Sequence, residues 1–130
     1  MTDDLDLDPQ PRGDLALQVV ALPSHTNQDG DIYGGWLVSQ MDLAGAQCAR
    51  LRANGRVATV AIETMAFIKP VPVGSTVYCY TDLLEVGRSS MRIRVEVWIS
   101  ANGSPKAKVT DSIFTFVAID DKGNTRPVDA

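Results

Sequence analysis

A single amphipathic helix, predicted over Trp36–Arg52, constrains the fold more than any other stretch of this chain. Its apolar and small residues recur at steps of three and four, the period of one helical face: Leu37, Met41, Ala44, Gly45, Cys48 and Leu51. At ~1.5 Å per residue the helix would be about 25 Å long, enough to cross a small domain. Because the side chains in its middle are small, we expect it to approach a sheet closely.

Most of the remaining chain predicts strands. Apolar or alternating runs, separated by Pro, Gly and Asn, mark five of them: Leu15–Leu22, Arg56–Lys69, Thr76–Glu85, Met91–Ser100 and Lys106–Ile119. The run Arg56–Lys69 is apolar on both faces, so we expect it to be covered on both sides. Asn102-Gly103 is a hairpin signal before the last strand. One strand, a long helix and then successive strands predict an α+β fold, in which an antiparallel sheet of five to six strands wraps a single helix.

Length and charge restrict the domain organisation and the possible partners. At 130 residues with a formal net charge of −4, the chain predicts one domain over residues 14–130 behind a flexible acidic tail over residues 1–13. The charge gives no general attraction to nucleic acid or to anionic membranes. No run is suited to a signal peptide or a membrane span. We therefore expect a soluble, cytoplasmic protein that binds neither nucleic acid nor membrane.

The cysteine and histidine content argues against a metal centre. Cys48 and Cys79 lie in a helical and a strand pattern, where we expect small buried side chains in a reducing compartment. His25 is the only histidine in the sequence, and no Cys/His cluster has metal-ligand spacing. We predict no metal and no resident cofactor.

Asp42, inside the predicted helix, is the strongest candidate for a catalytic residue. A carboxylate at this position has two interpretations: part of a solvated face, or a base held against an apolar surface. The residues that share its side of the helix are small or apolar, namely Gly35, Val38 and Ala46. They favour an apolar surface, which could belong to a second subunit, where Asp42 could act as a base. The pattern alone leaves both interpretations open.

The pair Gly34-Gly35 stands at the start of the helix. Backbone N–H groups at a helix start have no intrahelical partner, and the helix dipole favours negative charge beside them. Such groups can stabilise an oxyanion formed from a carbonyl. Two glycines can equally serve a tight turn from loop to helix, so this pattern also leaves two interpretations open.

Several motifs, in order along the chain, resemble the YciA-type acyl-CoA thioesterases. They are TNQDGDIYGGWLVSQMD (Thr26–Asp42), VATVAIETMAFIKPVPVG (Val57–Gly74), VGRSSMRIRVEVW (Val86–Trp98) and FVAID (Phe116–Asp120). The resemblance implies a hotdog fold, a long helix wrapped by an antiparallel sheet. It also implies dimers of paired sheets, which in this family commonly assemble further into hexamers, as trimers of dimers; the sequence leaves dimer and hexamer open. The implied activity is hydrolysis of acyl-CoA to free fatty acid and CoA, without a cofactor.

The resemblance also implies roles for individual residues. Asp42, in the S-Q-M-D string, matches the family's catalytic aspartate and would be the general base for water, with direct nucleophilic attack as the alternative. Asn27, in the T-N-x-x-G loop, would orient the water or the thioester carbonyl. The N–H of Gly35, beside Gly34, would stabilise the oxyanion. Aspartate and asparagine come from opposite subunits in such enzymes, so a dimer would hold two sites. We expect His25 to be a loop residue and not a catalyst.

The phosphates of CoA require local cations, because the chain is acidic overall. The glycine turn that carries Arg88, Ser89 and Ser90 offers free N–H groups and a guanidinium, both suited to phosphate. Lys69 and Arg56 are further candidates. The competing interpretation for these cations is a solvated strand face.

Two other functions are compatible with a hotdog fold. A non-catalytic acyl-CoA-binding protein, acting as a sensor, would share the fold and the ligand. That function predicts an attached DNA-binding segment or a lost carboxylate, and the sequence has neither. A hydratase or dehydratase would use an Asp/His pair, and the active-site histidine is missing. The sequence does not indicate the preferred acyl chain.

Overall fold

The computed structural model describes residues 10–100 and 107–129. They form β1 (Asp14–Val20), the 3₁₀ turn η1 (Pro23–His25), the helix α2 (Gly34–Ala53), β2 (Val57–Ile62), β3 (Thr76–Val86), β4 (Ser90–Ser100) and β5 (Ala107–Ala118). One long helix and five strands confirm the predicted α+β composition. The predicted Asn102-Gly103 turn and the tail residues 1–9 lie outside the described residues.

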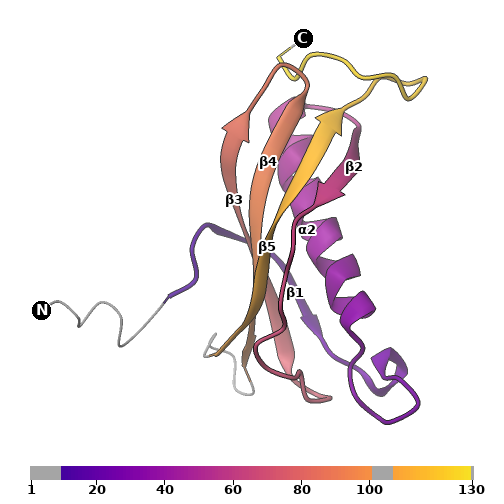
Figure 1. Ribbon diagram of the computed structural model, residues 1–130, viewed down its shortest axis with the longest axis vertical. Helices are drawn as coiled ribbons and strands as arrows, with labels where there is room; N and C mark the ends of the chain where they lie inside the picture. The colour runs from indigo at the N-terminus through magenta and orange to yellow at the C-terminus, as the bar shows by residue number, and fades with distance from the viewer. Residues whose placement is uncertain (1–9, 101–106, 130) are drawn as a thin grey trace, which may run out of the picture.

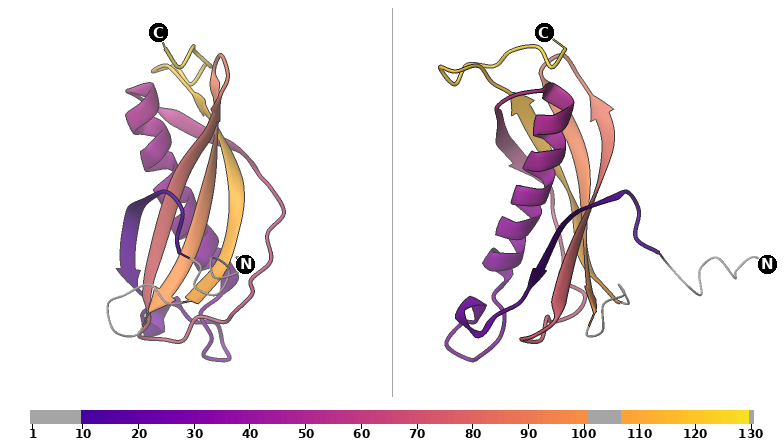
Figure 2. Two further views of the ribbon diagram at one scale, coloured as in Figure 1. Left: turned by 90° about the vertical axis from the view of Figure 1, so that its left-hand side faces the viewer. Right: turned by 180° about the vertical axis from the view of Figure 1, so that it is seen from behind.

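The five strands form one antiparallel sheet in the order β1-β3-β4-β5-β2. The helix α2 lies along one face of this sheet (Figures 1 and 2). β1 and β2, the strands that precede and follow the helix, are the two edges of the sheet. The helix therefore connects one edge of the sheet to the other, while β3, β4 and β5 form a central meander beneath it.

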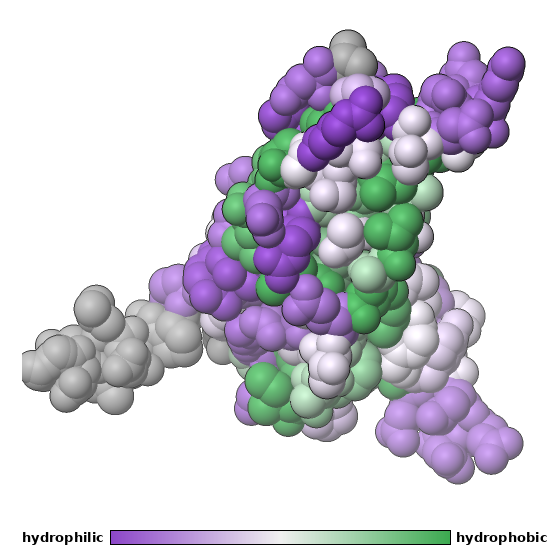
Figure 3. Space-filling view, turned by 45° about the horizontal axis from the view of Figure 1, so that its top comes forward, coloured by the Kyte–Doolittle hydropathy of each residue, from purple (hydrophilic) through white to green (hydrophobic). Residues whose placement is uncertain are grey.

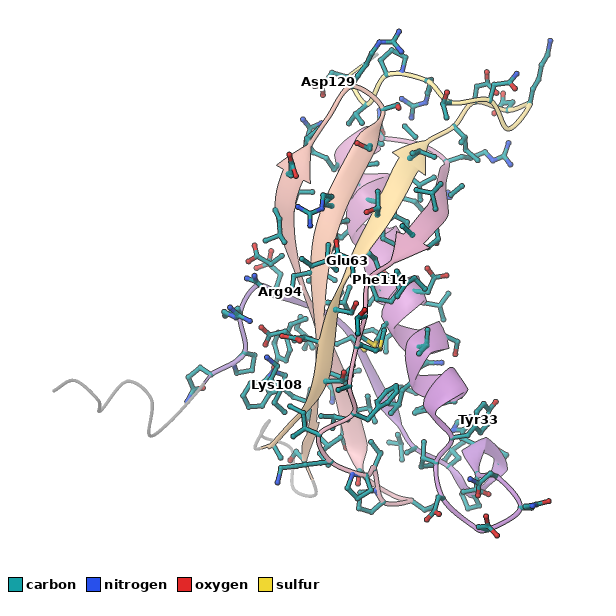
Figure 4. The ribbon with its side chains drawn as sticks, in the orientation of Figure 1. Tyr33, Glu63, Arg94, Lys108, Phe114 and Asp129 are labelled. Carbon is teal, nitrogen blue, oxygen red and sulfur yellow. The ribbon has the colours of Figure 1, made fainter. Side chains whose placement is uncertain are left out.

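The helix packs very closely on the sheet at Gly45. A Cβ atom at this position would lie 2.9 Å from two ring carbons of Phe116. Met41 and Ala44 on the same side of the helix are fully buried, and they share one apolar core with the central strands. Figure 4 shows Phe114 of β5 in this layer between sheet and helix. The prediction that small residues in the middle of the helix allow a close approach is confirmed.

The strand predicted over Arg56–Lys69 is shorter than expected. β2 ends at Ile62, although residues 63–68 continue beside β5 through backbone hydrogen bonds from the N–H groups of Glu63 and Ile68. The expectation that both faces of this run are covered is wrong for the single chain, because its large apolar side chains are exposed: Val60, Ile62, Phe67 and Ile68. The physical reason is the position of β2 at the edge of the sheet.

Exposed apolar residues therefore gather beside β2. Figure 3 shows hydrophobic residues in a column down its right-hand side, the side on which Figure 1 places α2 and β2. Edge strands offer unpaired backbone donors and acceptors to another chain. This edge therefore combines open backbone groups with exposed apolar side chains.

The face of the sheet away from the helix carries a polar network. Glu96, only 1% exposed, accepts hydrogen bonds from Arg12 Nε (2.7 Å) and from Trp98 Nε1 (2.9 Å). Arg94 pairs with Asp82 at 2.6 Å. Arg12 belongs to the range predicted as a tail, so part of that range is fastened to the sheet through a buried carboxylate.

Candidate active site

Asp42 lies two turns into α2, on the side of the helix that faces the edge strand β2. Thr59 of β2 donates a hydrogen bond from its Oγ1 to Asp42 Oδ1 at 2.6 Å. Thr59 pairs with Phe116 in the sheet, and the same Phe116 lies against Gly45. The close approach of helix and sheet therefore fixes the hydroxyl beside the carboxylate. Asp42 is partly exposed, and no described residue donates a hydrogen bond to its Oδ2, which leaves that oxygen open to water.

Asn27 begins a tight loop in front of α2. Its side-chain Oδ1 accepts the backbone N–H groups of Asp29 (2.9 Å) and Asp31 (3.1 Å), and its own N–H donates to the Asp31 carbonyl at 2.8 Å. An asparagine that replaces a backbone acceptor in this way forms an Asx turn. Because Oδ1 is occupied, the exposed Asn27 side chain offers its Nδ2 group to a ligand.

The start of α2 leaves backbone donors open. Tyr33 precedes the helix and makes no side-chain capping hydrogen bond, and the first turn holds no acidic residue. The N–H of Trp36 donates to the Tyr33 carbonyl at 3.1 Å. No described residue accepts a hydrogen bond from the N–H of Gly34 or Gly35. Two open N–H groups at the positive end of a helix dipole are suited to stabilising an oxyanion.

Asp42 and the open helix start do not meet within one chain. At ~1.5 Å per residue, Asp42 lies about 10 Å along the helix axis from Gly35. A carbonyl oxygen held at the Gly35 N–H would therefore lie two helical turns from the carboxylate. One chain brings Asn27, Gly34 and Gly35 together at the end of the helix and leaves Asp42 apart, beside the exposed edge of the sheet.

The predicted CoA-binding residues form two groups at opposite ends of the sheet. The carbonyls of Ser89 and Arg56 accept the N–H groups of Ala118 and Ile119, both at 2.9 Å, so these residues flank the end of β5. Lys69 follows Ile68, whose N–H donates to the Val109 carbonyl near the start of β5. From Val109 to Ala118 at the end of β5 the strand is about 30 Å long, at ~3.3 Å per residue. Figure 4 labels Asp129 at the first of these ends and Tyr33 at the second.

The cations of the first group differ in availability. The guanidinium of Arg56 donates to the carbonyls of Asp120 (3.0 Å) and Asp121 (2.9 Å), so it holds the closing turn of the chain. Arg88 is exposed, and its side chain pairs with no described residue. Arg88 is therefore the cation of this group that is open to a phosphate, beside the turn that includes Ser89 and Ser90.

Thr59 is the candidate site residue that the sequence interpretation missed. Its signal was available, because Thr59 is the single hydroxyl in the strand sequence VATVAI of β2. The alternation of that strand indicated which residues share a face, but not that this face would meet the helix at Asp42. Only the register between β2 and β5, together with the position of the helix, brings the two side chains together.

The two cysteines are poorly suited to nucleophilic chemistry. Burial raises the pKa of the Cys79 thiol to about 12, and burial is also the main cause that raises the pKa of Cys48. A thiol with a raised pKa holds little of the reactive thiolate at neutral pH.

Among the described residues, no group of His, Cys, Asp or Glu could hold a metal ion. No described helix is long and apolar enough to cross a membrane.

Two hollows among the described residues lie away from the candidate residues. One, of about 200 Å³, is lined by Glu63, Thr64, Arg94, Asp111, Ser112 and Ile113. The other, of about 220 Å³, is lined by Asp14, Leu15, Ala16, Gln47, Cys48, Leu51 and Thr81. Neither is lined by Asp42, Asn27 or Gly35. In a single copy Asn27 and Gly35 are exposed, and Asp42 is partly exposed.

Comparison with known proteins defines the class. The model of the thioesterase superfamily matches residues 29–106. An acyl-CoA thioester hydrolase of Haemophilus influenzae is 51% identical over 123 residues, which are 92% of this chain and 80% of that protein. The acyl-CoA thioester hydrolase YciA of Escherichia coli is 45% identical over 120 residues, 89% of this chain and 91% of its own.

Solved structures agree with the fold. The crystal structure of a hexameric, broad-specificity acyl-coenzyme A thioesterase superposes with a TM-score of 0.89 at 50% sequence identity, covering 94% of this chain and 85% of that one. A hexameric thioesterase of Yersinia pestis superposes with a TM-score of 0.88 at 45% identity, covering 93% and 99%. The chain therefore belongs to the YciA-type acyl-CoA thioester hydrolases of the thioesterase superfamily, and its fold is the hotdog fold.

Substituted variants of such enzymes have also been solved. The broad-specificity thioesterase has a structure in which one aspartate is replaced by alanine. The acyl-CoA hydrolase of Staphylococcus aureus has one with a threonine and one with an asparagine replaced by alanine, at 26% identity to this chain. Aspartate, threonine and asparagine are the residue types of Asp42, Thr59 and Asn27.

Proposed function

We propose that this acyl-CoA thioester hydrolase cleaves acyl-CoA at a site formed between two copies of the chain. One copy supplies Asp42, and the other supplies Asn27 and Gly35. The observation that carries this proposal is the separation of about 10 Å along the helix between Gly35 and Asp42 of one chain, together with the exposed apolar edge beside Asp42. A second copy at that edge would cover the apolar residues and bring its own open helix start to the carboxylate.

Hydrolysis needs a base, an oxyanion donor and a path for the leaving group. Asp42 Oδ2 takes a proton from water while the water oxygen attacks the thioester carbon, and Thr59 holds Oδ1 in place at 2.6 Å. The carbonyl oxygen becomes an oxyanion and accepts a hydrogen bond from the Gly35 N–H of the other copy. Such a donor, when well placed, stabilises the transition state by ~3–4 kcal/mol. The tetrahedral intermediate then collapses, the carbonyl re-forms and the C–S bond breaks. Asp42 gives its proton to the leaving sulfur, which releases CoA as the free thiol together with the fatty acid and restores the carboxylate.

The fixed amide of Asn27 defines its role. With Oδ1 occupied by two backbone N–H groups, its Nδ2 can only donate. Nδ2 therefore donates to the substrate carbonyl or to the oxygen of the attacking water, and orients it. This role depends on the loop geometry, because the two hydrogen bonds to Oδ1 set the direction of the donor.

The CoA phosphates bind at the end of the sheet that carries Arg88, Ser89 and Ser90. The free guanidinium of Arg88 and the glycine turn are the groups suited to phosphate. Arg56, which is engaged by backbone carbonyls, supports this end, and Lys69 lies at the other end, where it is available to the second copy.

The assembly follows from the edge strand. β2 of one copy pairs with β2 of another, so the two sheets become continuous and each dimer holds two sites. Relatives that are hexamers support a further association into trimers of dimers. The apolar residues of α2 that point away from the sheet, Leu43 and Leu51, are exposed in the single chain and are available for that second contact.

The test is release of free thiol from a series of acyl-CoA substrates of increasing chain length. The wild type should release CoA, and Asp42→Asn should lower kcat by about 10²–10⁴-fold, the range of a positioned base. Asp129→Asn is the matched control, because Asp129 is an exposed carboxylate that pairs with Arg52, and it should keep full activity. Full activity of Asp42→Asn would contradict the mechanism. Tight acyl-CoA binding without any thiol release from the wild type would indicate a sensor.

A further inference from the structure

His25 makes three contacts that link the loop of Asn27 to the helix. Its Nδ1 accepts the backbone N–H of Leu22 at 3.0 Å. Its ring stacks on that of Trp36, with centroids 4.4 Å apart and an interplanar angle of 19°. Its backbone carbonyl accepts the N–H of Tyr33 at 3.3 Å. His25 thus contacts three parts of the chain: Leu22 before the loop, Tyr33 just before α2, and Trp36 in the first turn of α2.

The loop needs such an attachment. Its internal hydrogen bonds, donated by the N–H groups of Asp29 and Asp31 to Asn27 Oδ1, set its shape but not its position relative to the helix. The tip, residues 27–31, is exposed throughout. Ile32 packs against the core at one end of the loop, and His25 is the corresponding anchor at the other end. Trp36 is 6% exposed, so the ring of His25 rests on a fixed surface.

We propose that His25 is a positioning residue for catalysis. It holds the Asn27 loop against the start of α2, and so fixes the Nδ2 group of Asn27 relative to the N–H of Gly35. The inference rests on the proposed function, which assigns those two groups to the substrate. His25 itself touches neither the substrate nor the water; it acts through Asn27. The neutral ring with its proton on Nε2 is the form that accepts the Leu22 N–H.

Three variants separate the contacts of His25. His25→Asn keeps a side-chain acceptor for the Leu22 N–H and loses the stack on Trp36. His25→Phe keeps the stack and loses the acceptor. His25→Ala loses both and should lower kcat about tenfold, less than the ~10²-fold that a 1 Å misplacement can cost. KM for acyl-CoA should change little, because the phosphates bind elsewhere. His25→Asn and His25→Phe should each recover part of the lost kcat.

The decisive measurement repeats His25→Ala in an Asn27→Ala background. If His25 acts through Asn27, the double variant should be no slower than Asn27→Ala alone, because the group to be positioned is gone. Equal losses in both backgrounds would overturn the inference and indicate a general structural role. If His25→Ala does not fold, the same comparison is made with His25→Asn.

The experiment also separates two kinds of failure. Full activity of His25→Ala beside a slow Asn27→Ala would overturn the role of His25 alone. Full activity of Asn27→Ala would overturn the proposed role of Asn27, and the role of His25 with it. Thermal unfolding of each variant, followed by circular dichroism, verifies that rates are compared between folded proteins.

Discussion

The two ends of α2 differ in whether their terminal backbone groups are hydrogen-bonded within the chain. At the C-terminal end, Asn54 adopts the left-handed conformation and donates its N–H to the Arg50 carbonyl. Arg126 donates to the Ala53 carbonyl at 2.8 Å, and Arg52 pairs with Asp129 at 2.7 Å. At the N-terminal end, no side chain caps the helix and no acidic residue lies in the first turn.

The difference separates stability from function. Unpaired carbonyls at a helix C-terminus and unpaired N–H groups at its N-terminus have similar costs, and proteins normally satisfy both. Here the carbonyl end is satisfied by the chain itself, while no described side chain caps the N–H end. The open end carries Gly34 and Gly35, whose lack of side chains lets a ligand approach the backbone. We therefore expect changes at the closed end to alter stability, and changes at the open end to alter turnover.

The largest effect should come from mixing two inactive variants. If the open end of one chain serves Asp42 of another, Asp42→Asn and Asn27→Ala chains should restore each other. A refolded equimolar mixture should recover about a quarter of the wild-type activity, because half of the dimers are mixed and each then has one intact site of two. Thiol release before and after mixing measures this. A mixture as inactive as its components would place both residues in the same chain's site.

Removing the open donor itself should have the next largest effect. Gly35→Pro deletes the N–H in a turn of the helix where proline is tolerated, and should lower kcat by about 10²–10³-fold. Gly35→Ala is the comparison variant: it keeps the N–H and adds one Cβ, which would meet Tyr33 at an ordinary 3.4 Å. It therefore measures the cost of crowding the ligand apart from the cost of losing the donor, and its kcat should lie above that of Gly35→Pro. Similar kcat values for the two variants would show that this N–H does not stabilise the oxyanion.

A substitution of Thr59 in β2 tests the part of the candidate site around Asp42, in the middle of α2. Thr59→Val keeps the shape of the side chain and deletes the hydrogen bond to Asp42 Oδ1. We expect kcat to fall about tenfold, equivalent to a charge-assisted hydrogen bond of ~1.4 kcal/mol. Thr59→Ser, which keeps the hydroxyl, should remain close to the wild type. Equal kcat values for Thr59→Val and the wild type would remove Thr59 from the site.

The smallest effect should appear at the closed end. Arg126→Met removes the hydrogen bond to the Ala53 carbonyl and should reduce the free energy of unfolding by about 1 kcal/mol. Urea denaturation measures the loss, and kcat should stay close to that of the wild type, because Arg126 lies at the end of the helix away from the candidate site. A marked fall in kcat at unchanged stability would contradict the division between the two ends.

The helix and the sheet could be predicted from the sequence because their signals are local. The period of Leu37, Met41 and Ala44 indicated the buried face of α2, and the alternation in Met91–Ser100 indicated a strand. The bounds of β2 could not be predicted, because the apolar run Arg56–Lys69 continues past the point where strand pairing stops at Ile62. An edge strand exposed in one copy and a strand covered on both sides have the same apolar pattern.

The site was predicted in part. Asp42 and the pair Gly34-Gly35 were candidates from the helix pattern, which left a second interpretation open for each, and Asn27 entered through the resemblance to known enzymes. Thr59 was missed because its partner lies across the fold, where register decides the contact. His25 was recognised only as a loop residue, since neither its stack on Trp36 nor its bond to Leu22 has a signature in the sequence.

The exposed edge of β2 has a consequence for how such an enzyme is measured. If the catalytic groups meet only across paired edges, the active species is the assembly, and its amount depends on the square of the chain concentration when association is weak. Specific activity should then decline on dilution below the dissociation constant of the dimer and recover on concentration. A cell that makes less of this protein would lose catalysis faster than it loses the chain.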